Sequence, residues 1–308
     1  MKQSKDSEEL TRVGPGTVMG GFMRQYWIPA AKSSELKADG APMRLMLLGE
    51  KLIAFRDTQG RVGVMDHRCA HRCASLFLGR NEEDGIRCTY HGWKFDVTGK
   101  CVDMPSVPAH QDFKEKVQLK AYKTAERNGL IWVYMGARET PPPLPMIEVT
   151  MLPEAEVDIF FVQRECNWVQ SLEGDIDTSH FGFLHAGHLD ADNVPSGHPL
   201  DHTAGDRAPQ YHVRDVPWGT SYGAYREVQG TEQTYWRFAN FMMPFWTQTP
   251  QGEFPLHVHA RAWVPMDDEH TMFVHLRWRI AKSGMRNLLE PLNDGGTLGG
   301  GKPLPDLE

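Results

Sequence analysis

No hydrophobic run in this sequence is long enough to cross a membrane. The longest apolar stretches lie at residues 45–48 and 130–135, whereas a transmembrane helix needs about 20 apolar residues in a row. Residues 1–10 are polar and charged, and they do not have the pattern of a secretory signal. We therefore expect a cytoplasmic protein with no membrane partner.

The sequence also lacks an excess of positive charge and a set of paired cysteines. Its 33 Lys and Arg residues against 40 Asp and Glu give a net charge of -7, so no nucleic-acid partner is expected. Five cysteines are an odd number in a chain without an export signal, which argues against a disulfide framework. Cys69, Cys73 and Cys88 lie close together and beside histidines, which favours metal binding.

Between Tyr26 and about Gly136, apolar residues come in short runs separated by turn residues. No helical period of apolar positions passes through this region, which predicts an all-β domain. Asp57-Thr-Gln-Gly60 separates two of the runs and predicts a hairpin. Strands are expected over residues 43–48, 51–56, 61–65, 86–89, 93–97 and 130–134.

A proline-rich segment, Thr140-Pro-Pro-Pro-Leu-Pro145, follows and can continue neither a helix nor a central strand. Beyond it, residues 165–185 favour a helix, which predicts an α+β domain with a helix packed on an antiparallel sheet. Strands of that sheet are expected over residues 219–228, 234–243, 257–264 and 271–280. The expected organisation is a lead-in (1–26), a β domain (27–139), a linker (140–145) and a second domain (146–308).

The β domain contains two pairs of metal-ligand residues. Cys69-Ala-His71 and Cys88-Thr-Tyr-His91 each carry one cysteine and one histidine, with sixteen residues between the pairs. Four such ligands fit either tetrahedral zinc or an iron–sulfur cluster. Because each segment supplies one thiolate and one imidazole, the pattern favours a [2Fe–2S] cluster in which one iron takes both thiolates and the other both imidazoles.

The second domain contains a separate constellation on its expected helix. Asp177 and His180 are three residues apart and are expected on one helix face. His185 joins them only if the helix ends or distorts, which Gly182 makes easy. Two imidazoles and a carboxylate on one face of a metal leave open positions, as in mononuclear non-haem Fe(II) oxygenases.

Together the two constellations resemble the Rieske non-haem iron aromatic-ring oxygenases, and in particular the large (alpha) subunits of the phthalate-dioxygenase-like group. The resemblance rests on Asp66-His-Arg-Cys-Ala-His-Arg72, on Cys88-Thr-Tyr-His-Gly-Trp-Lys-Phe95 and on Glu173-x3-Asp177-x2-His180-x4-His185. Respiratory Rieske proteins carry a further cysteine in each ligand segment, joined as a disulfide. Tyr90 stands at that position here, so the oxygenase branch fits better.

The resemblance implies an all-β Rieske domain followed by a START-like α+β catalytic domain. It implies that Cys69, His71, Cys88 and His91 hold the cluster and that His180 and His185 hold the iron. In the family, the aspartate at the position of Asp177 is not a ligand. It bridges a ligand histidine and the second-segment cluster histidine of a neighbouring subunit, and thereby conducts electrons.

The function that the resemblance implies is that of a terminal oxygenase component. Such an enzyme uses O2 and electrons from a reductase or ferredoxin to hydroxylate an aromatic compound, by ring cis-dihydroxylation or by O-demethylation, and it forms head-to-tail homotrimers or multiples of them. The alternative is a Rieske-type electron-transfer protein whose second domain is not catalytic. The oxygenase needs three irons per chain and the electron carrier two.

Two parts of the expected catalytic site are less well marked. The third iron ligand of the family is a downstream aspartate, for which we find no motif. Asp267-Asp-Glu269 is expected in a turn, Asp190, Asp192 and Asp294 have no motif around them, and we expect the sequence to be C-terminally incomplete. Arg237 or Arg261 is a candidate for holding a substrate carboxylate. The candidate residues for an aromatic-substrate pocket are Phe238, Phe241, Met243, Phe245 and Trp246.

Overall fold

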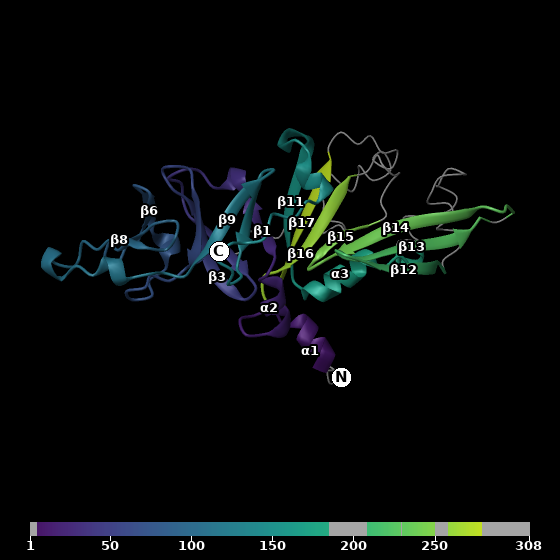
Figure 1. Ribbon diagram of the computed structural model, residues 1–308, viewed down its shortest axis with the longest axis horizontal. Coiled ribbons are helices and arrows are strands. Elements are labelled where there is room, and N and C mark those ends of the chain that lie inside the picture. The colour runs from purple at the N-terminus through teal and green to yellow at the C-terminus, as the bar shows by residue number, and fades with distance from the viewer. Residues whose placement is uncertain (1–4, 185–207, 229, 250–257, 279–308) are drawn as a thin grey trace.

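The computed structural model describes residues 5–184, 208–228, 230–249 and 258–278. Within these residues the chain forms three antiparallel sheets and four α-helices, arranged as an elongated molecule (Figure 1). The two N-terminal sheets lie toward one end of the long axis, and the C-terminal sheet lies toward the other. None of the described helices has the length and apolar character that a membrane span requires.

The larger N-terminal sheet has six strands in the order β1-β10-β9-β4-β3-β2. The turn predicted at Asp57–Gly60 joins β3 to β4, with Gly60 at a φ of 82° that glycine adopts without strain. Asn128 and Gly129, with φ of 52° and 71°, form the tight hairpin between β9 and β10. The strands are β1 (Trp27–Lys32), β2 (Met43–Leu47), β3 (Glu50–Arg56), β4 (Val62–Asp66), β9 (Ala121–Arg127) and β10 (Leu130–Tyr134).

A small four-stranded sheet of order β5-β6-β7-β8 adjoins the first sheet and lies at the end of the molecule (Figure 1). Its strands are β5 (Arg80–Glu82), β6 (Gly85–Arg87), β7 (Lys94–Phe95) and β8 (Cys101–Asp103). The short connection between β6 and β7 contains Cys88 and His91. A separate buried cluster, which includes Phe55, Ile86 and Phe95, supports this sheet from within.

The C-terminal sheet has seven strands in the order β11-β17-β16-β15-β14-β13-β12. Helix α3 (Trp168–Ile176) packs against its central strands, and β16 is buried along its whole length. The predicted fold class, an all-β part followed by an α+β part, is confirmed. The strands are β11 (Val157–Arg164), β12 (Gln210–Val216), β13 (Gly219–Glu227), β14 (Thr234–Met242), β15 (Trp246–Gln248), β16 (His259–Pro265) and β17 (Thr271–Trp278).

The helices differ from the sequence expectation at two places. The lead-in contains α1 (Lys5–Thr11) and α2 (Val18–Met23), and the Thr17 hydroxyl caps α2 by accepting the Gly20 N–H at 3.1 Å. The single helix expected over residues 165–185 is divided, because four residues separate the end of α3 at Ile176 from the start of α4 (Phe181–Leu184). Short 3-10 helices lie at Ser33–Glu35, Leu76–Leu78, Ala109–Gln111, Lys114–Lys116, Glu148–Met151 and Glu154–Glu156.

One buried core runs through both halves of the molecule. The rings of Trp132 on β10 and Trp246 on β15 lie 5.9 Å apart, and both side chains are buried. The backbone N–H of Leu48 donates to the carbonyl of Pro265 at 3.1 Å, so the β2–β3 turn also touches the C-terminal sheet. The shared core therefore fixes the six-stranded sheet relative to α3, and the separate cluster around Phe55 joins the small sheet to the six-stranded sheet.

Candidate metal centres

The first ligand segment follows β4 and folds into a tight turn. The N–H of Cys73 donates to the carbonyl of Cys69 at 3.0 Å, and the N–H of Cys69 donates to that of Ala74 at 2.9 Å. Cys73 has a φ of 57°, the left-handed conformation that closes the turn. The Cys69 side chain is thereby directed inward and is only 2% exposed, whereas Cys73 is exposed.

The second ligand segment is the connection from β6 to β7, and it has a similar turn. The N–H of Gly92 donates to the carbonyl of Cys88 at 3.0 Å, and the Cys88 N–H donates to the carbonyl of Trp93 at 2.9 Å. Gly92 has a φ of 76°, and a Cβ atom there would lie 2.7 Å from Cγ of Pro105. Glycine is therefore required both by the turn and by the neighbouring proline.

The two segments bring all four predicted cluster ligands together. The rings of His71 and His91 lie 4.5 Å apart, and the thiols of Cys69 and Cys88 are close enough to influence each other's ionisation. Burial raises the pKa of Cys69 to about 11, and the charge of the adjacent Cys88 acts in the same direction. Two buried neighbouring thiols become thiolates only when a cation compensates their charge, which is what a metal cluster supplies.

The two histidines have different surroundings. The His71 ring stacks on Trp93 at 4.5 Å and 8°, and its Nδ1 atom is buried with no hydrogen-bond partner. Desolvation lowers the pKa of His71, with smaller contributions from His91 and Arg72, which favours the neutral ring that binds metals. The His91 ring lies 4.0 Å from that of Tyr90, tilted by 38°, and Tyr90 is largely exposed. A buried, unbonded imidazole nitrogen beside two buried thiols fits the ligand set of a [2Fe–2S] cluster.

The residues around the predicted mononuclear site lie where α3 ends. The carboxylate of Asp177 accepts the N–H groups of Ser179 at 2.7 Å and His180 at 3.3 Å. Its Oδ2 atom also lies 3.3 Å from Nδ1 of His180. Asp177 and His180 therefore meet as the sequence predicts, but across the break between two helices and not along one helix face. His185, the other predicted iron ligand, lies outside the described residues.

Helix α3 is fastened to the sheet by a buried carboxylate that sequence reasoning missed. Asp175 accepts short hydrogen bonds from the Arg261 guanidinium and the Thr247 hydroxyl, and another from the Trp263 indole at 3.3 Å. Both side chains of the Asp175–Arg261 pair are buried. The three partners lie on β15 and β16, 72 to 88 residues from Asp175, so no local pattern pointed to them.

The end of α3 is also held by an aromatic residue of β13. The hydroxyl of Tyr222 lies 2.8 Å from that of Thr178 and donates a short hydrogen bond to the carbonyl of Ile176. Burial raises the pKa of Tyr222 to about 12, so the residue remains a neutral donor. Its position next to Asp177 shows that it supports the helix end.

No third iron ligand is evident in the part of the chain that the structure describes. No three His, Cys, Asp or Glu side chains converge there on one metal position. This agrees with a cluster in which each iron takes only two protein ligands. It also agrees with an iron site that has one ligand outside the described residues. The Asp267 carboxylate accepts the N–H groups of Glu269 and His270, as its predicted turn role requires. Asp190, Asp192 and Asp294 are outside the described residues.

The five candidate pocket residues have different surroundings in the described part of the chain. Phe245 and Trp246 are buried in the main core, and Phe241 packs against it. Phe238 is 66% exposed and stacks on Trp236. Met243 and Trp246 line one cleft of about 510 Å³, together with residues of α2 and of the proline-rich segment.

The two candidate arginines are separated by their surroundings. Arg261 forms a buried ion pair with Asp175. Arg237 is also buried, but it lies on β14. Cross-strand pairing of Ala224 with Arg237 and of Tyr222 with Ala239 places Arg237 on the sheet face that carries Tyr222. Since Tyr222 contacts the end of α3, Arg237 and Phe241 belong to the α3-facing side of the sheet. Phe238, one residue beyond Arg237, points to the opposite face.

Comparison with known families agrees with this architecture. Residues 26–123 match the model described as Rieske [2Fe-2S] domain, and residues 133–287 match the one described as LigXa C-terminal domain like. The fold and the site thus define a Rieske [2Fe–2S] protein with an oxygenase-type second domain. Oxygenases of this kind use a mononuclear non-haem iron as well as the cluster.

Similar proteins are oxygenase subunits. The chain is 55% identical, over 97% of its length, to the 3-chlorobenzoate-3,4-dioxygenase oxygenase subunit of Comamonas testosteroni, of which it covers 68%. It is 38% identical, over 87% of its length, to the phthalate 4,5-dioxygenase oxygenase subunit of Pseudomonas putida, of which it covers 62%. The chain belongs to the Rieske non-haem iron oxygenase family, as the resemblance predicts, and it spans 62–68% of these two relatives.

Solved structures support the fold. Dicamba monooxygenase bound to 3,6-dichlorosalicylic acid matches with a TM-score of 0.67 at 19% identity, over 91% of this chain and 86% of that one. The reduced complex between oxygenase and ferredoxin in carbazole 1,9a-dioxygenase matches with a TM-score of 0.62 at 22% identity, over 95% of this chain and 81% of that one.

Proposed function

We propose that this protein is the terminal oxygenase component of an aromatic-ring-hydroxylating system. Its substrates would be O2 and a small aromatic compound, and its electrons would come from a reductase or ferredoxin. The observation that carries the proposal is the convergence of Cys69, His71, Cys88 and His91, two buried thiols beside two imidazoles, in a chain of this family. The relatives' activities support the same class of reaction.

The proposed ligands divide the chemistry between the two ends of the molecule. Cys69, His71, Cys88 and His91 would hold the [2Fe–2S] cluster, and His180 and His185 the mononuclear Fe(II). When bound, the cluster supplies single electrons and the iron supplies the site of O2 activation. Asp177 would fix the orientation of the His180 ring, whose Nδ1 atom lies 3.3 Å from its carboxylate.

The substrate class that the sheet favours is an aromatic carboxylic acid. Arg237 places a buried positive charge on the sheet face that contacts the end of α3, beside Tyr222 and Phe241. A guanidinium there would pair with a carboxylate, while apolar side chains would contact the ring. The 3-chlorobenzoate and phthalate oxygenases named above act on molecules of this kind.

A panel of substrates tests this proposal. The purified protein, reconstituted with a reductase, should consume O2 and NADH when given aromatic acids, and should contain three irons per chain. Arg237→Met should raise KM for the acids but not for uncharged aryl methyl ethers, and Arg277→Met, on strand β17, is the control. Two irons per chain and no substrate-dependent O2 uptake would instead identify an electron carrier with a non-catalytic second domain.

We also propose that the active unit is a head-to-tail homotrimer or a multiple of it. The small sheet with β6 and β8 lies at one end of the molecule, and α3 lies well along the long axis from it (Figure 1). Because the shared core fixes this separation, Asp177 of one copy is expected to meet His91 of the next. Such a heterologous contact closes into a ring when the rotation between copies allows it.

A further inference from the structure

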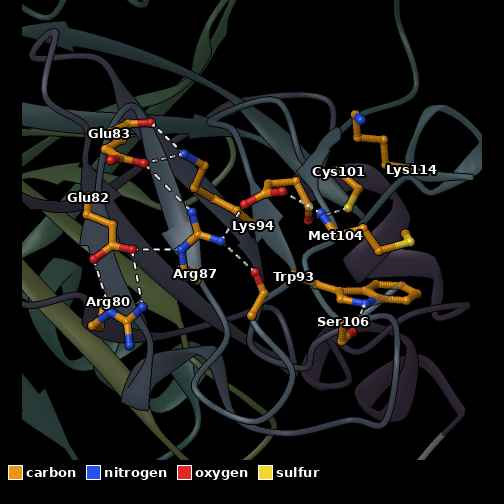
Figure 2. Close-up of polar contacts among 12 residues, drawn as sticks. Arg80, Glu82, Glu83, Arg87, Trp93, Lys94, Cys101, Met104, Ser106 and Lys114 are labelled. Atoms are coloured by element: carbon orange, nitrogen blue, oxygen red, sulfur yellow. Dashed lines mark hydrogen bonds and ion pairs between the residues drawn. The ribbon is translucent and has the colours of Figure 1, made fainter. Parts of the chain in front are cut away.

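Arg87, the residue immediately before Cys88, forms a group of contacts around the second ligand segment. Its Nε atom donates to Glu82 at 2.7 Å, and its Nη1 atom donates to Asp103 at 2.6 Å. Figure 2 shows the guanidinium between the acidic side chains of Glu82 and Glu83. The Arg87 side chain is only 12% exposed, so these are not loose surface contacts.

The same guanidinium also reaches the far end of the ligand segment. Its Nη1 atom donates to the carbonyl of Gly92 at 2.8 Å. Gly92 in turn donates its own N–H to the carbonyl of Cys88 at 3.0 Å. One side chain therefore connects the residue before the ligand cysteine to the residue after the ligand histidine. This connection holds the backbone of the segment that carries His91.

The two arginines near the second ligand segment differ in burial and in their acidic partners. Hydrogen bonding to Arg87 is the largest of the causes that lower the pKa of Asp103. Glu82 is shared with Arg80, whose side chain is 62% exposed on the solvent side of the group. Arg87 is thus the buried cation next to the loop, and Arg80 is its exposed counterpart. A fixed cation near an iron–sulfur cluster stabilises the more negative, reduced form and raises the reduction potential.

We propose that Arg87 is a positioning residue for the cluster: it fixes the segment from Cys88 to Gly92 through the Gly92 carbonyl, and its charge, balanced by Asp103, sets the reduction potential. This inference rests on the proposed cluster ligands. It goes further, because it assigns the control of the cluster's reduction potential to Arg87 and Asp103, which are not ligands.

Four variants of the whole protein separate charge from geometry. Arg87→Met removes the cation and should lower the potential, whereas Asp103→Asn removes the opposing anion and should raise it. Arg87→Lys keeps the charge but not the forked geometry, so its potential should remain near that of the unchanged protein while the cluster is lost faster on heating. Arg80→Met removes an exposed arginine that also pairs with Glu82. Its reduction potential and its cluster retention on heating should match those of the unchanged protein.

The potential is measured by redox titration of the cluster absorbance, and cluster retention by the same absorbance during heating. An unchanged potential in Arg87→Met, or an unchanged or lowered potential in Asp103→Asn, would overturn the electrostatic part. Cluster retention in Arg87→Lys equal to that of the unchanged protein would overturn the positioning part. If Arg87→Met does not assemble a cluster, the direction in which Asp103→Asn shifts the reduction potential decides whether the electrostatic part holds. A parent protein without a Rieske-type spectrum would overturn the proposed ligands and this inference with them, whereas the variant outcomes above would overturn only the role of Arg87.

Discussion

At the scale of single residues, Asp177 shows how one carboxylate serves two purposes. It closes the break between α3 and α4 by accepting two backbone N–H groups, and it lies 3.3 Å from the ring nitrogen of His180. A side chain held by backbone donors has little freedom to rotate, so Asp177 is well placed for its proposed role of orienting the His180 imidazole. Its side chain is nevertheless 44% exposed, which leaves an oxygen accessible to a neighbouring molecule.

Replacing Asp177 tests this double role. Asp177→Asn keeps an oxygen that accepts from the backbone, so the helix break should be preserved and all three irons should remain bound. It removes the negative charge, so electron delivery to the mononuclear site should slow by roughly 10–100-fold. Single-turnover measurements on pre-reduced protein, with iron content determined in parallel, give both quantities.

Two results would contradict the bridging role of Asp177. A variant that transfers electrons at the rate of the unchanged protein would make the residue a bystander. A variant that loses only its mononuclear iron would make it a ligand. Asp215→Asn, which changes an aspartate of the edge strand β12, is the control for a general effect of lost charge.

At the scale of elements, α3 depends on one buried ion pair for its position. Asp175 connects the helix to β15 and β16, and Tyr222 holds its last carbonyl group. Breaking a buried ion pair by removing one charge costs about 3–5 kcal/mol, because the remaining charge stays buried without compensation. The predicted iron ligands follow α3 directly, so displacement of the helix should also displace them.

Asp175→Asn should therefore lower the free energy of unfolding by roughly 3–5 kcal/mol and reduce the retention of mononuclear iron. Urea unfolding followed by tryptophan fluorescence measures the first effect, and metal analysis the second. The control is Asp158→Asn, which breaks the more exposed Asp158–Arg277 pair between β11 and β17 and should cost about 1 kcal/mol or less. Equal midpoints for the two variants would contradict the anchoring role.

The same elements show what the sequence could predict. Most of the longer strands, such as β3, β10 and β16, match runs rich in apolar residues. Both cluster segments were found because their ligands lie within three residues of each other. The break after Ile176 was missed because the helical period continues through it, and only Asp177 hydrogen bonds show the interruption. The contacts of Asp175 lie 72 to 88 residues away in sequence, and those of Arg87 depend on how β5 to β8 pair into a sheet, so neither residue has a local signature.

At the scale of the whole molecule, the proposed mechanism depends on the separation of the two proposed ligand sets. The small sheet and α3 lie far apart along the long axis (Figure 1), and the shared core around Trp132 and Trp246 does not allow one to fold onto the other. Electron transfer weakens steeply with distance, so a monomer of this shape has no short route between its own two sites. Assembly of copies would supply that route.

Mixed assemblies test whether the route runs between copies. A His91→Ala chain should lack a functional cluster but keep its iron site, and a His180→Ala chain should have the reverse defect. Neither should turn over alone. Co-expressed in equal amounts as a ring, they should recover about a quarter of the full activity, because a random ring places an intact cluster beside an intact iron site at about one contact in four. Substrate-dependent O2 uptake by the purified mixture measures this. The His180→Ala chain co-expressed with itself is the control, and a mixture as inactive as that control would show that electrons move only within one chain.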